Sequence, residues 1–501
     1  MGSEGVQDFG ESQRRIGALI EQACRDRGAT FTGVVYLWGL DTGSPGDESS
    51  LARDELVVTG GALGLFKGLV AARASHDVAP RVWMLTRGAQ LPPEGAAYGG
   101  LMQSPLWGLG RSVRLEEAAM IVRELLDAGA EDQVALRGAS RFAPRLVRGS
   151  RDAVRADGGL PLGAEGSYLI TGGLGSLGRK LADWMVAQGA RHLAVTSRRR
   201  PDAEAESFLQ GIRDRGCNVV LMVADATHED DVRGLVARLR AELPPLKGII
   251  HSAGMLKDGV LDRMSWEDFT AVTSPKIKGS WLLHEHTRDL DLDFFVLFSS
   301  VLSVIGAAGQ INYTAGNAFM DALAAHRRAA GLAAAVINWG PWAGTGLATD
   351  AGKTGEAIWR RRGTEYLPAE GAMSVFEHLM ATGKHQAFVS ITRWPLFLRD
   401  AAPAPALYAE LEKEAAGQLE GAVGKPPDAR PLQRRLAEAA PGQRKGVAVD
   451  FVAGLVADLL GIDGSVDTRQ SLAELGLDSL MAVNLVNRLE DALKKSVPTA
   501  S

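Results

Sequence analysis

The sequence predicts an α/β protein built around a doubly wound parallel sheet and followed by a smaller helical segment. Short apolar runs, separated by stretches of helical periodicity, recur as in repeated β–α–β units. They lie at residues 167–170, 192–196, 218–223, 248–250 and 294–298. A glycine-rich turn follows the first of these runs. The C-terminal residues instead contain two helix-like stretches joined by a loop, at 447–460 and from 482 to about 493.

Length and composition limit the possible classes of protein. A chain of 501 residues, 46% of them hydrophobic, is long enough for two to four domains with sizeable cores. The net charge of −5 gives no basic footprint for nucleic acid. Cys24 and Cys217 lie far apart, so we expect neither a disulfide framework nor a metal site, but thiols in a reducing cytoplasm. No run reaches membrane-spanning length and no signal-peptide pattern is present, so we expect a cytoplasmic protein without a membrane partner.

Residues 1–159 form the first predicted unit. Strand-like runs at 33–40 and 81–86 enclose a helical segment, which is the alternation of a β–α–β unit. No glycine-rich loop follows either run. The sequence therefore predicts no phosphate-binding loop in this part of the chain.

The glycine-rich turn lies between the apolar run at 167–170 and a helical stretch at 179–188. Gly173, Gly175 and Gly178 form a GxGxxG pattern in the strand–turn–helix context of a dinucleotide site. The glycines let the backbone approach a pyrophosphate, and the helix N-terminus supplies donors and positive potential. The alternative is a tight turn without a ligand. The predicted loop also includes Thr171, Ser176 and Leu177.

The ends of the later strands complete the predicted cofactor site. Strand 192–196 is followed by Ser197 and Arg198, where an NAD site usually has an acidic residue. A hydroxyl and a guanidinium suit the additional phosphate of NADP, although arginines at a strand end are often only solvated surface. The sequence thus predicts NADPH as cofactor and no metal. Further contacts are expected from Asp225 and Ala226 at the adenine and from His251, Ser252, Ala253 and Gly254 near the nicotinamide ribose.

A serine–tyrosine pair follows the apolar run at 294–298. Ser300 precedes Tyr313 by thirteen residues, which places the serine at a strand end and the tyrosine on the next helix. A buried tyrosine can protonate a carbonyl oxygen if a neighbouring cation lowers its pKa. Ser299 is the alternative for the serine. The alternative for the pair is an ordinary helix with an exposed tyrosine.

These motifs resemble those of short-chain dehydrogenases/reductases and, more closely, the ketoreductase domains of modular type I polyketide synthases. Most short-chain reductases have a lysine four residues after the tyrosine, where this chain has Asn317. The candidate lysine is instead Lys276, with Lys278 as the alternative. This exchange is typical of the polyketide synthase branch. The resemblance implies two Rossmann-like subdomains: a truncated structural half at 1–159 and a complete NADPH-binding half at 160–400.

The resemblance also implies an activity. The substrate would be a β-ketoacyl thioester on an acyl carrier protein, reduced to the β-hydroxyacyl thioester during chain elongation. Tyr313 would give the proton, Ser300 would hold the carbonyl oxygen, Lys276 would lower the pKa of the tyrosine, and Asn317 would order the site. The alternatives are a stand-alone dehydrogenase acting on a free ketone, a redox-silent ketoreductase, and a carrier scaffold.

The stereochemical outcome has its own motif in this family. A Leu-Asp-Asp triplet accompanies the B-type product, a D-hydroxyl group. The corresponding residues are Leu256, Lys257 and Asp258, so the last aspartate is kept. The tryptophan of the opposite A-type would fall on Ile305. We therefore expect a B-type reductase, with Asp258 as an ordinary turn residue in the alternative interpretation.

The C-terminal part resembles the start of an acyl carrier protein. Residues 401–445 are rich in Pro, Ala and Glu and are predicted to form a linker with some helix. In residues 446–501, Leu-Gly-Leu-Asp-Ser-Leu is similar to a phosphopantetheine attachment site with Ser479 as the modified residue; a plain N-cap is the alternative. The third and fourth carrier helices are absent, so we expect a partial, weakly stable carrier domain and other domains of the same synthase as partners.

Overall fold

The computed structural model describes most of the first 460 residues and a few isolated positions besides. The continuous described ranges are 33–42, 45–73, 81–90, 100–116, 131–137, 140–149, 162–345, 362–400, 404–419, 432–440 and 442–460. Within these ranges, no helix is long and apolar enough to cross a lipid bilayer.

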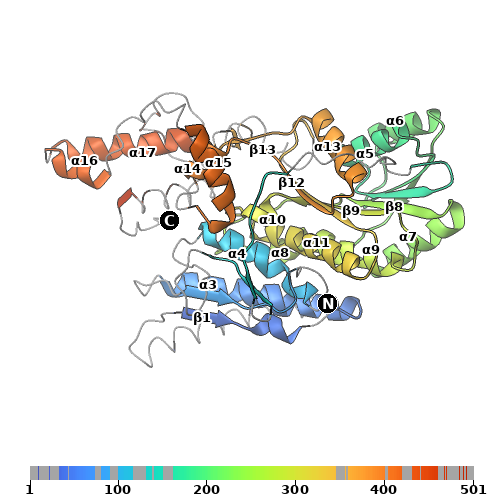
Figure 1. The fold of residues 1–501 in the computed structure, drawn as a ribbon, viewed down its shortest axis with the longest axis horizontal. Coiled ribbons are helices and arrows are strands. Elements are labelled where there is room, and N and C mark those ends of the chain that lie inside the picture. Colours follow the sequence, from blue (N-terminus) through green and yellow to red (C-terminus); the bar gives the residue numbers. More distant parts are fainter. Residues whose placement is uncertain are drawn as a thin grey trace.

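The centre of the fold is a seven-stranded sheet in which all neighbouring strands are parallel (Figure 1). The strand order is β12-β10-β9-β8-β5-β6-β7. The order reverses between β5 and β8, and open α/β sheets bind ligands at such a reversal. The strands are β5 (Ser167–Thr171), β6 (His192–Ser197), β7 (Asn218–Val223), β8 (Leu246–His251), β9 (Phe294–Ser300), β10 (Ala335–Trp339) and β12 (Gln386–Val389).

Helices cover both faces of this sheet, which confirms the predicted doubly wound α/β fold. In Figure 1, α5, α6 and α13 lie on one side and α7, α9 and α11 on the other. Side chains alternate along the strands: Leu169 packs in one core with Trp281, whereas Tyr168 and Ile170 pack in the other with Phe376. The helices are α5 (Ser176–Ala187), α6 (Ala203–Asp214), α7 (Glu229–Glu242), α8 (Trp266–Lys276), α9 (Lys278–Thr287), α10 (Leu302–Ile305), α11 (Ile311–Ala329) and α13 (Ala369–Thr382).

The N-terminal part of the chain, called the first half below after the predicted structural half at 1–159, is a smaller α/β unit packed against α8 and α11. Its β1 (Gly33–Tyr36) and β2 (Arg81–Met84) pair in parallel. Phe66 and Leu109 share a core with Phe269 of α8 and Ala315 of α11, so the two halves bury one common apolar surface. The helical elements of this half are η1 (Trp38–Asp41), α2 (Glu48–Glu55), η2 (Leu56–Gly60), α3 (Gly61–Arg73), η3 (Leu101–Gln103) and α4 (Pro105–Glu116).

Helix α4 makes very close contact with α11. A Cβ atom on Gly108 would overlap the backbone carbonyl oxygen of Thr314, and the hydroxyl groups of Ser112 and Thr314 lie 2.7 Å apart. Glycine at 108 is therefore needed for the helices to approach this closely. This contact supports the first turns of α11, where Tyr313 lies.

The remaining described elements lie around and after the main sheet. The start of the predicted linker packs against the main α/β unit, because Leu411 and Ala415 of α15 share a core with Val301 and Leu398. After the linker, α17 covers the predicted helix at 447–460, and Val456 packs with Leu485. The elements are β3 (Ala135–Arg137), β4 (Ser140–Phe142), β11 (Thr364–Glu365), β13 (Ile391–Thr392), α14 (Trp394–Asp400), η5 (Ala406–Tyr408), α15 (Ala409–Leu419), α16 (Leu432–Glu438) and α17 (Arg444–Leu460).

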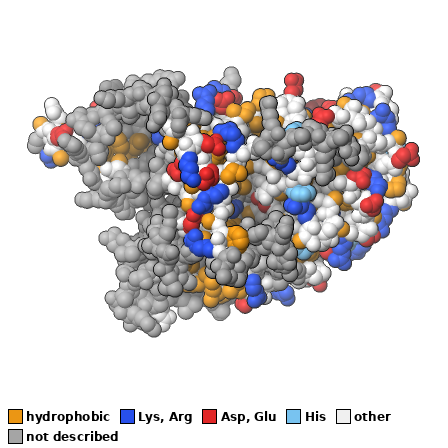
Figure 2. All heavy atoms as spheres, in the orientation of Figure 1, with side chains coloured by type: hydrophobic (Ala, Val, Ile, Leu, Met, Phe, Trp, Pro, Cys, Tyr) orange, Lys and Arg blue, Asp and Glu red, His pale blue; other side chains and the backbone are white. Residues whose placement is uncertain are grey.

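On the face drawn, the described residues mix basic and acidic side chains. In Figure 2, Lys and Arg side chains alternate with Asp and Glu over the described part of that face. This distribution agrees with the small net charge of −5.

Candidate active site

Ser300 and Tyr313 meet at the C-terminal edge of the sheet. Ser300 is the last residue of β9, and Tyr313 lies in the first turn of α11. Between them the chain turns at Gly306, whose φ of 78° is left-handed and favours glycine. The Ser300 side chain is close enough to act on the phenol, since its hydrogen-bonding effect lowers the pKa of Tyr313. The N–H of Leu302 donates to Ser300 Oγ at 3.2 Å, which leaves the serine hydrogen free to be donated.

Lys276 and Asn317 complete the group around the tyrosine. Lys276, at the end of α8, is 3% exposed. Its Nζ donates to Asn317 Oδ1 at 3.1 Å and lies 4.9 Å from the centre of the Tyr313 ring. Asn317 Nδ2 donates to the backbone carbonyl of Tyr313 at 2.8 Å. The structure thus brings together all four residues that the sequence indicated. Asn317 joins α11, on which it lies, to Lys276 at the end of α8.

Burial dominates the titration of these groups. It lowers the pKa of Lys276 to about 8, against the opposing effect of the negative charge on Asp321. Burial also raises the pKa of Tyr313, and hydrogen bonds with Ser300 and Asn317 offset this only in part. The pKa of Tyr313 is thus raised overall because burial has the largest effect, and the predicted electrostatic effect of Lys276 on it stays a prediction. The phenol stays protonated near pH 7, which is the form that donates a proton.

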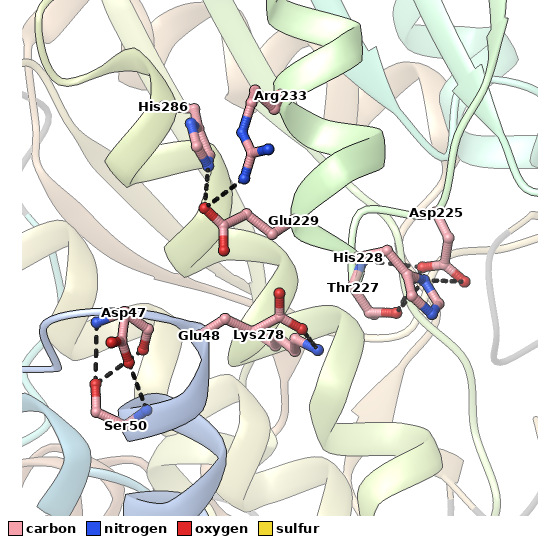
Figure 3. A network of polar contacts seen from close by, with 10 residues as sticks. All are labelled: Asp47, Glu48, Ser50, Asp225, Thr227, His228, Glu229, Arg233, Lys278 and His286. Carbon is pink, nitrogen blue, oxygen red and sulfur yellow. Dashed lines mark hydrogen bonds and ion pairs between the residues drawn. The ribbon is translucent and has the colours of Figure 1, made fainter. Parts of the chain in front are cut away.

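The alternative lysine and serine have other partners. Lys278 forms an ion pair with Glu48 of α2, which joins α9 to the first half of the chain (Figure 3). Ser299 Oγ donates to the carbonyl oxygen of Asn317 at 3.3 Å and accepts from Asn338 Nδ2 at 3.1 Å. The contacts of Lys278 and Ser299 thus lie away from the phenol.

A polar cluster under Ser300 was missed in the sequence analysis. Asp321 is half-buried, and its carboxylate accepts from Ser303 Oγ at 2.6 Å and from Asn338 Nδ2 at 2.8 Å. Gln386 Nε2 in turn donates to Asn338 Oδ1 at 3.1 Å. The available signal was an acidic residue four places after Asn317, on the same face of the helix and within the otherwise apolar stretch 318–325.

The loop after β5 has the shape and donors that a pyrophosphate requires. Gly172 has φ 69°, and a Cβ on Gly173 would lie only 2.6 Å from Cβ of Val195. A Cβ on Gly178 would overlap the carbonyl oxygen of Gly172. Helix α5 starts at Ser176, and no side chain caps its first N–H groups. An uncapped helix N-terminus next to a glycine backbone without side chains favours the binding of an anion. The residues present therefore fit the pyrophosphate of a dinucleotide.

Two predicted cofactor residues use their side chains inside the protein. His251 is 1% exposed, and its Nε2 donates to the carbonyl oxygen of Pro275 at 2.9 Å. Nδ1 therefore accepts from the hydroxyl of Thr171 at 2.7 Å. Burial, together with the charge of Lys276, lowers the pKa of His251 to about 4, so the ring is neutral. Neither side chain offers a polar group to a ribose, because both are used to join β5, β8 and α8.

The neighbouring predicted residues lie against the glycine loop. Ser252 Oγ donates to the carbonyl oxygen of Thr171 at 2.8 Å. A Cβ on Gly172 would lie 3.1 Å from Cα of Ala253, so the strand end that leads to Gly254 packs directly on the loop. Leu177 packs against the core formed with α5.

The predicted adenine and 2′-phosphate end is polar and accessible. Arg198 is exposed, and Ser197 Oγ accepts from the N–H of Arg199 at 3.2 Å. Asp225 Oδ1 accepts from the N–H and hydroxyl of Thr227 at 2.9 and 2.8 Å (Figure 3). Burial acts to raise the pKa of Asp225, but these hydrogen bonds and the charges of His228 and Arg198 leave it lowered. Ala226 lies beside Gly279, where a Cβ would be 3.4 Å from the alanine Cβ.

The segment with the predicted stereochemical residues is joined to the start of α11. Asp258 Oδ2 accepts from Gln310 Nε2 at 2.8 Å, and the carbonyl oxygen of Lys257 accepts from Asn312 Nδ2 at 2.9 Å. The charge of Asp258 contributes to the raised pKa of Tyr313. Leu256 is half-buried in this segment. The predicted phosphopantetheine site, Ser479, lies outside the described residues.

Comparison with known proteins agrees with this geometry. Residues 166–344 match the family model described as KR domain, and residues 450–501 match a phosphopantetheine attachment site. Polyketide synthase GfsA of Streptomyces halstedii is 34% identical over an alignment 499 residues long, which covers 93% of this chain and 6% of that synthase. A solved A1-type ketoreductase is 31% identical with a TM-score of 0.72, over 81% of this chain and 87% of the other. The first ketoreductase of the tylosin synthase is 32% identical with a TM-score of 0.68, over 80% and 87%.

The parallel sheet with its glycine loop defines a reductase fold of the short-chain dehydrogenase/reductase type. Within that class, the chain belongs to the ketoreductases of type I polyketide synthases and carries a phosphopantetheine-attachment region after the reductase. The predicted family is thereby confirmed, and membership implies an oxidoreductase. The chain spans only 6% and 9% of the two Streptomyces halstedii synthases GfsA and GfsB.

Proposed function

We propose that this chain uses NADPH to reduce a β-ketoacyl group, held as a thioester on an acyl carrier protein, to the β-hydroxyacyl thioester. One observation carries the proposal: the buried side chain of Tyr313 has the ammonium of Lys276 4.9 Å from its ring centre, and the Ser300 side chain is close enough to act on the pKa of its phenol. This is the arrangement that proton donation to a ketone oxygen requires. The glycine loop at the same end of the sheet supports a cofactor site beside it.

The residues of the loop and of the strand ends would hold the cofactor. Backbone groups around Ser176 would bind the pyrophosphate, the hydroxyl of Ser197 and the guanidinium of Arg198 would bind the 2′-phosphate, and Asp225 would lie at the adenine. When bound, NADPH supplies the hydride that the β-carbon of the ketone accepts. The glycine loop, Leu177, Ala226 and residues 252–254 would line the remainder of the dinucleotide site.

The protein supplies the proton. Ser300 donates a hydrogen bond that positions the ketone oxygen, and Tyr313 transfers its phenolic proton to that oxygen as negative charge develops there. The phenol O–H bond breaks, the carbinol O–H bond forms, and a phenolate remains beside Lys276. The ammonium stabilises this phenolate until it takes up a proton from solvent. Asn317 keeps Lys276 and Tyr313 in place, because it accepts from the lysine and donates to the backbone carbonyl of the tyrosine.

The proposal is tested with the purified chain, NADPH and a β-ketoacyl thioester, by following the loss of NADPH absorbance. Tyr313→Phe should abolish reduction and leave NADPH affinity almost unchanged, because only the proton donor is removed. Tyr168→Phe is the matched control, because it removes the hydroxyl of a different tyrosine. The Tyr168 side chain packs in the core on one face of the sheet, and its hydroxyl accepts from the N–H of Gly163. Near-normal turnover by Tyr313→Phe would contradict the assignment. NADPH binding without turnover in the unmodified chain would favour the redox-silent alternative, and preference for a free ketone would favour the stand-alone dehydrogenase.

A B-type product is the finer part of the proposal. It is supported by Asp258, whose segment is bonded to the start of α11, and by Ile305 at the position of the A-type tryptophan. Chiral chromatography of the hydroxyacyl product should give the D-hydroxyl isomer. An L-hydroxyl product would contradict this part alone.

The C-terminal region is proposed to carry phosphopantetheine on Ser479. The match of residues 450–501 to an attachment site supports this. Incubation with coenzyme A and a phosphopantetheinyl transferase should add one phosphopantetheine in the mass spectrum, and Ser479→Ala should add none. Loading of the alanine variant would place the modification elsewhere. Other domains of the same synthase would supply the substrate.

A further inference from the structure

We infer that Asp321 is a positioning residue of this reductase, whose carboxylate holds the strand end at Ser300 and keeps a negative charge close to Lys276. This inference rests on the proposed function. Asp321 follows Asn317 by four residues and Tyr313 by eight, so all three side chains lie along one face of α11. The carboxylate therefore lies one turn below the amide that holds the lysine.

Hydrogen bonds connect Asp321 to the end of β9. Ser303 Oγ lies 2.6 Å from Asp321 Oδ2 and 2.8 Å from the carbonyl oxygen of Ser300. A hydroxyl has one hydrogen, which the shorter, charge-assisted contact to the carboxylate takes. Asn338 Nδ2 has two hydrogens: one is directed to Asp321 Oδ1 at 2.8 Å, and the other is shared among Ser303 Oγ at 2.9 Å, Ser299 Oγ at 3.1 Å and the carbonyl oxygen of Ser300 at 3.4 Å.

These donors are themselves rigidly held. Ser303 is fully buried, and Asn338 is 1% exposed. Gln386 of β12 fixes the orientation of the Asn338 amide, because its Nε2 donates to Asn338 Oδ1. The amide nitrogen of Asn338 must therefore face the carboxylate. The last residues of β9 are thus tied, through two buried side chains, to one acceptor on α11.

Asp321 also interacts with Lys276 through its charge. The negative charge of Asp321 acts to raise the pKa of Lys276, against the larger opposite effect of burial. Burial raises the pKa of Asp321, whereas hydrogen bonds from Ser303, Ser299 and Asn338 and the charge of Arg111 of α4 act to lower it and so favour the carboxylate. The Arg111 guanidinium also donates to the carbonyl oxygen of Ser303. In the described structure, Arg111 and Lys276 are the charged side chains found to interact with this carboxylate; its other neighbours are the neutral Ser299, Ser303 and Asn338.

The sign of the effect on catalysis follows from these contacts. Without the negative charge, the pKa of Lys276 would fall below about 8. The ammonium that stabilises the phenolate would then be lost at a lower pH. The alkaline limb of the pH profile of kcat should therefore move to lower pH. The affinities for substrate and NADPH should not change, because Asp321 contacts neither of them in the proposed site.

The test compares Asp321→Asn, Ser303→Ala and the unmodified chain. Asp321→Asn should lower kcat roughly tenfold and move its alkaline limb down by roughly one pH unit, with KM and the Kd of NADPH within about twofold. Ser303→Ala should lower kcat but keep the alkaline limb in place, because it removes a tether and no charge. The control is Asp183→Asn, an exposed carboxylate of α5 that pairs with Arg215. A folded Asp321→Asn variant with the original kcat and pH profile would overturn the inference.

A second measurement does not depend on turnover. The unfolding midpoints of Asp321→Asn, Lys276→Met and the double variant form a double-mutant cycle. If the two charges attract, the double variant should lose less than the two single losses added together. Additive losses would overturn the charge argument even in a chain that never oxidises NADPH. The two failures can therefore be told apart. Absence of turnover in the unmodified chain would contradict the proposed function, whereas additive losses in the cycle would contradict this inference, whether or not the chain turns over.

Discussion

The ammonium of Lys276 lies 4.9 Å from the centre of the Tyr313 ring, although the two residues come from different helices. The lysine reaches the ring across the backbone of Gly316, where a Cβ would lie 3.1 Å from Lys276 Cδ. The absence of a side chain at 316 therefore decides where the charge lies relative to the phenol.

Gly316→Ala should move the lysine and slow reduction. We expect kcat to fall several-fold while the Kd of NADPH stays the same, because the new methyl group presses on the lysine side chain and not on the glycine loop. Gly234→Ala is the matched control: it is an exposed glycine inside α7 with open space around it, so the change should stabilise the protein by roughly 0.5–1 kcal/mol and leave kcat unchanged. Unaltered kcat in Gly316→Ala would show that the lysine tolerates displacement.

Gly108→Ala should weaken the contact between the two halves of the reductase. The new Cβ would overlap the Thr314 carbonyl oxygen, which cannot rotate away, so we expect a loss of about 1–3 kcal/mol in the free energy of unfolding together with lower kcat. The measurement is denaturant unfolding beside steady-state kinetics. Gly110→Ala is the control, because its Cβ would meet the flexible end of Met84. Equal effects of the two substitutions would contradict this account.

Glu55 should make the stability of the protein depend on pH. It is 6% exposed, accepts from Thr273 Oγ1 at 2.6 Å, and has a pKa raised by burial to about 7. A carboxyl group that stays neutral in the folded state stabilises it at low pH, and this stability is lost as pH rises from about 4.5 to about 7.

Glu55→Gln should therefore be more stable than the unmodified chain at pH 8, by roughly 1–3 kcal/mol, and equal to it near pH 4. Denaturant unfolding over this pH range measures the difference. Glu242→Gln, an exposed residue paired with Arg238 on α7, should keep the original slope between pH 5 and 7. Parallel curves for Glu55→Gln and the unmodified chain would show that the buried group is already ionised.

Arg198→Ala should weaken NADPH binding by roughly tenfold or more and leave NADH binding unchanged, because only NADPH carries the 2′-phosphate. Fluorescence titration with each cofactor measures this. Arg213→Ala, a surface residue of α6 that pairs with Glu206, should change neither affinity. Equal losses for both cofactors would place Arg198 at another part of the nucleotide.

The local features of this fold could be predicted from the sequence, because each depends on a short segment. The strand predicted at 167–170 is β5, Ser167–Thr171, since an apolar run ending at a glycine turn has few other solutions. Lys276 and Asn317 were indicated by the family resemblance, and both lie at Tyr313. The partners of His251 and Asp321 could not be predicted, because they come from distant strands and helices. The same reason explains α15, whose composition is typical of a linker but which packs on α14 and η5.

The contact at Gly108 also bears on how such enzymes can be recombined. The helix that presents Tyr313 rests on a helix from the half that has no glycine loop, and Phe66 and Leu109 of that half share its core. A transplant that moves only residues 160–400 into another polyketide synthase would leave this apolar surface uncovered and Tyr313, the proposed proton donor, without its support. A hybrid synthase should therefore keep its activity only when the junction lies upstream of β1, so that both halves travel as one piece.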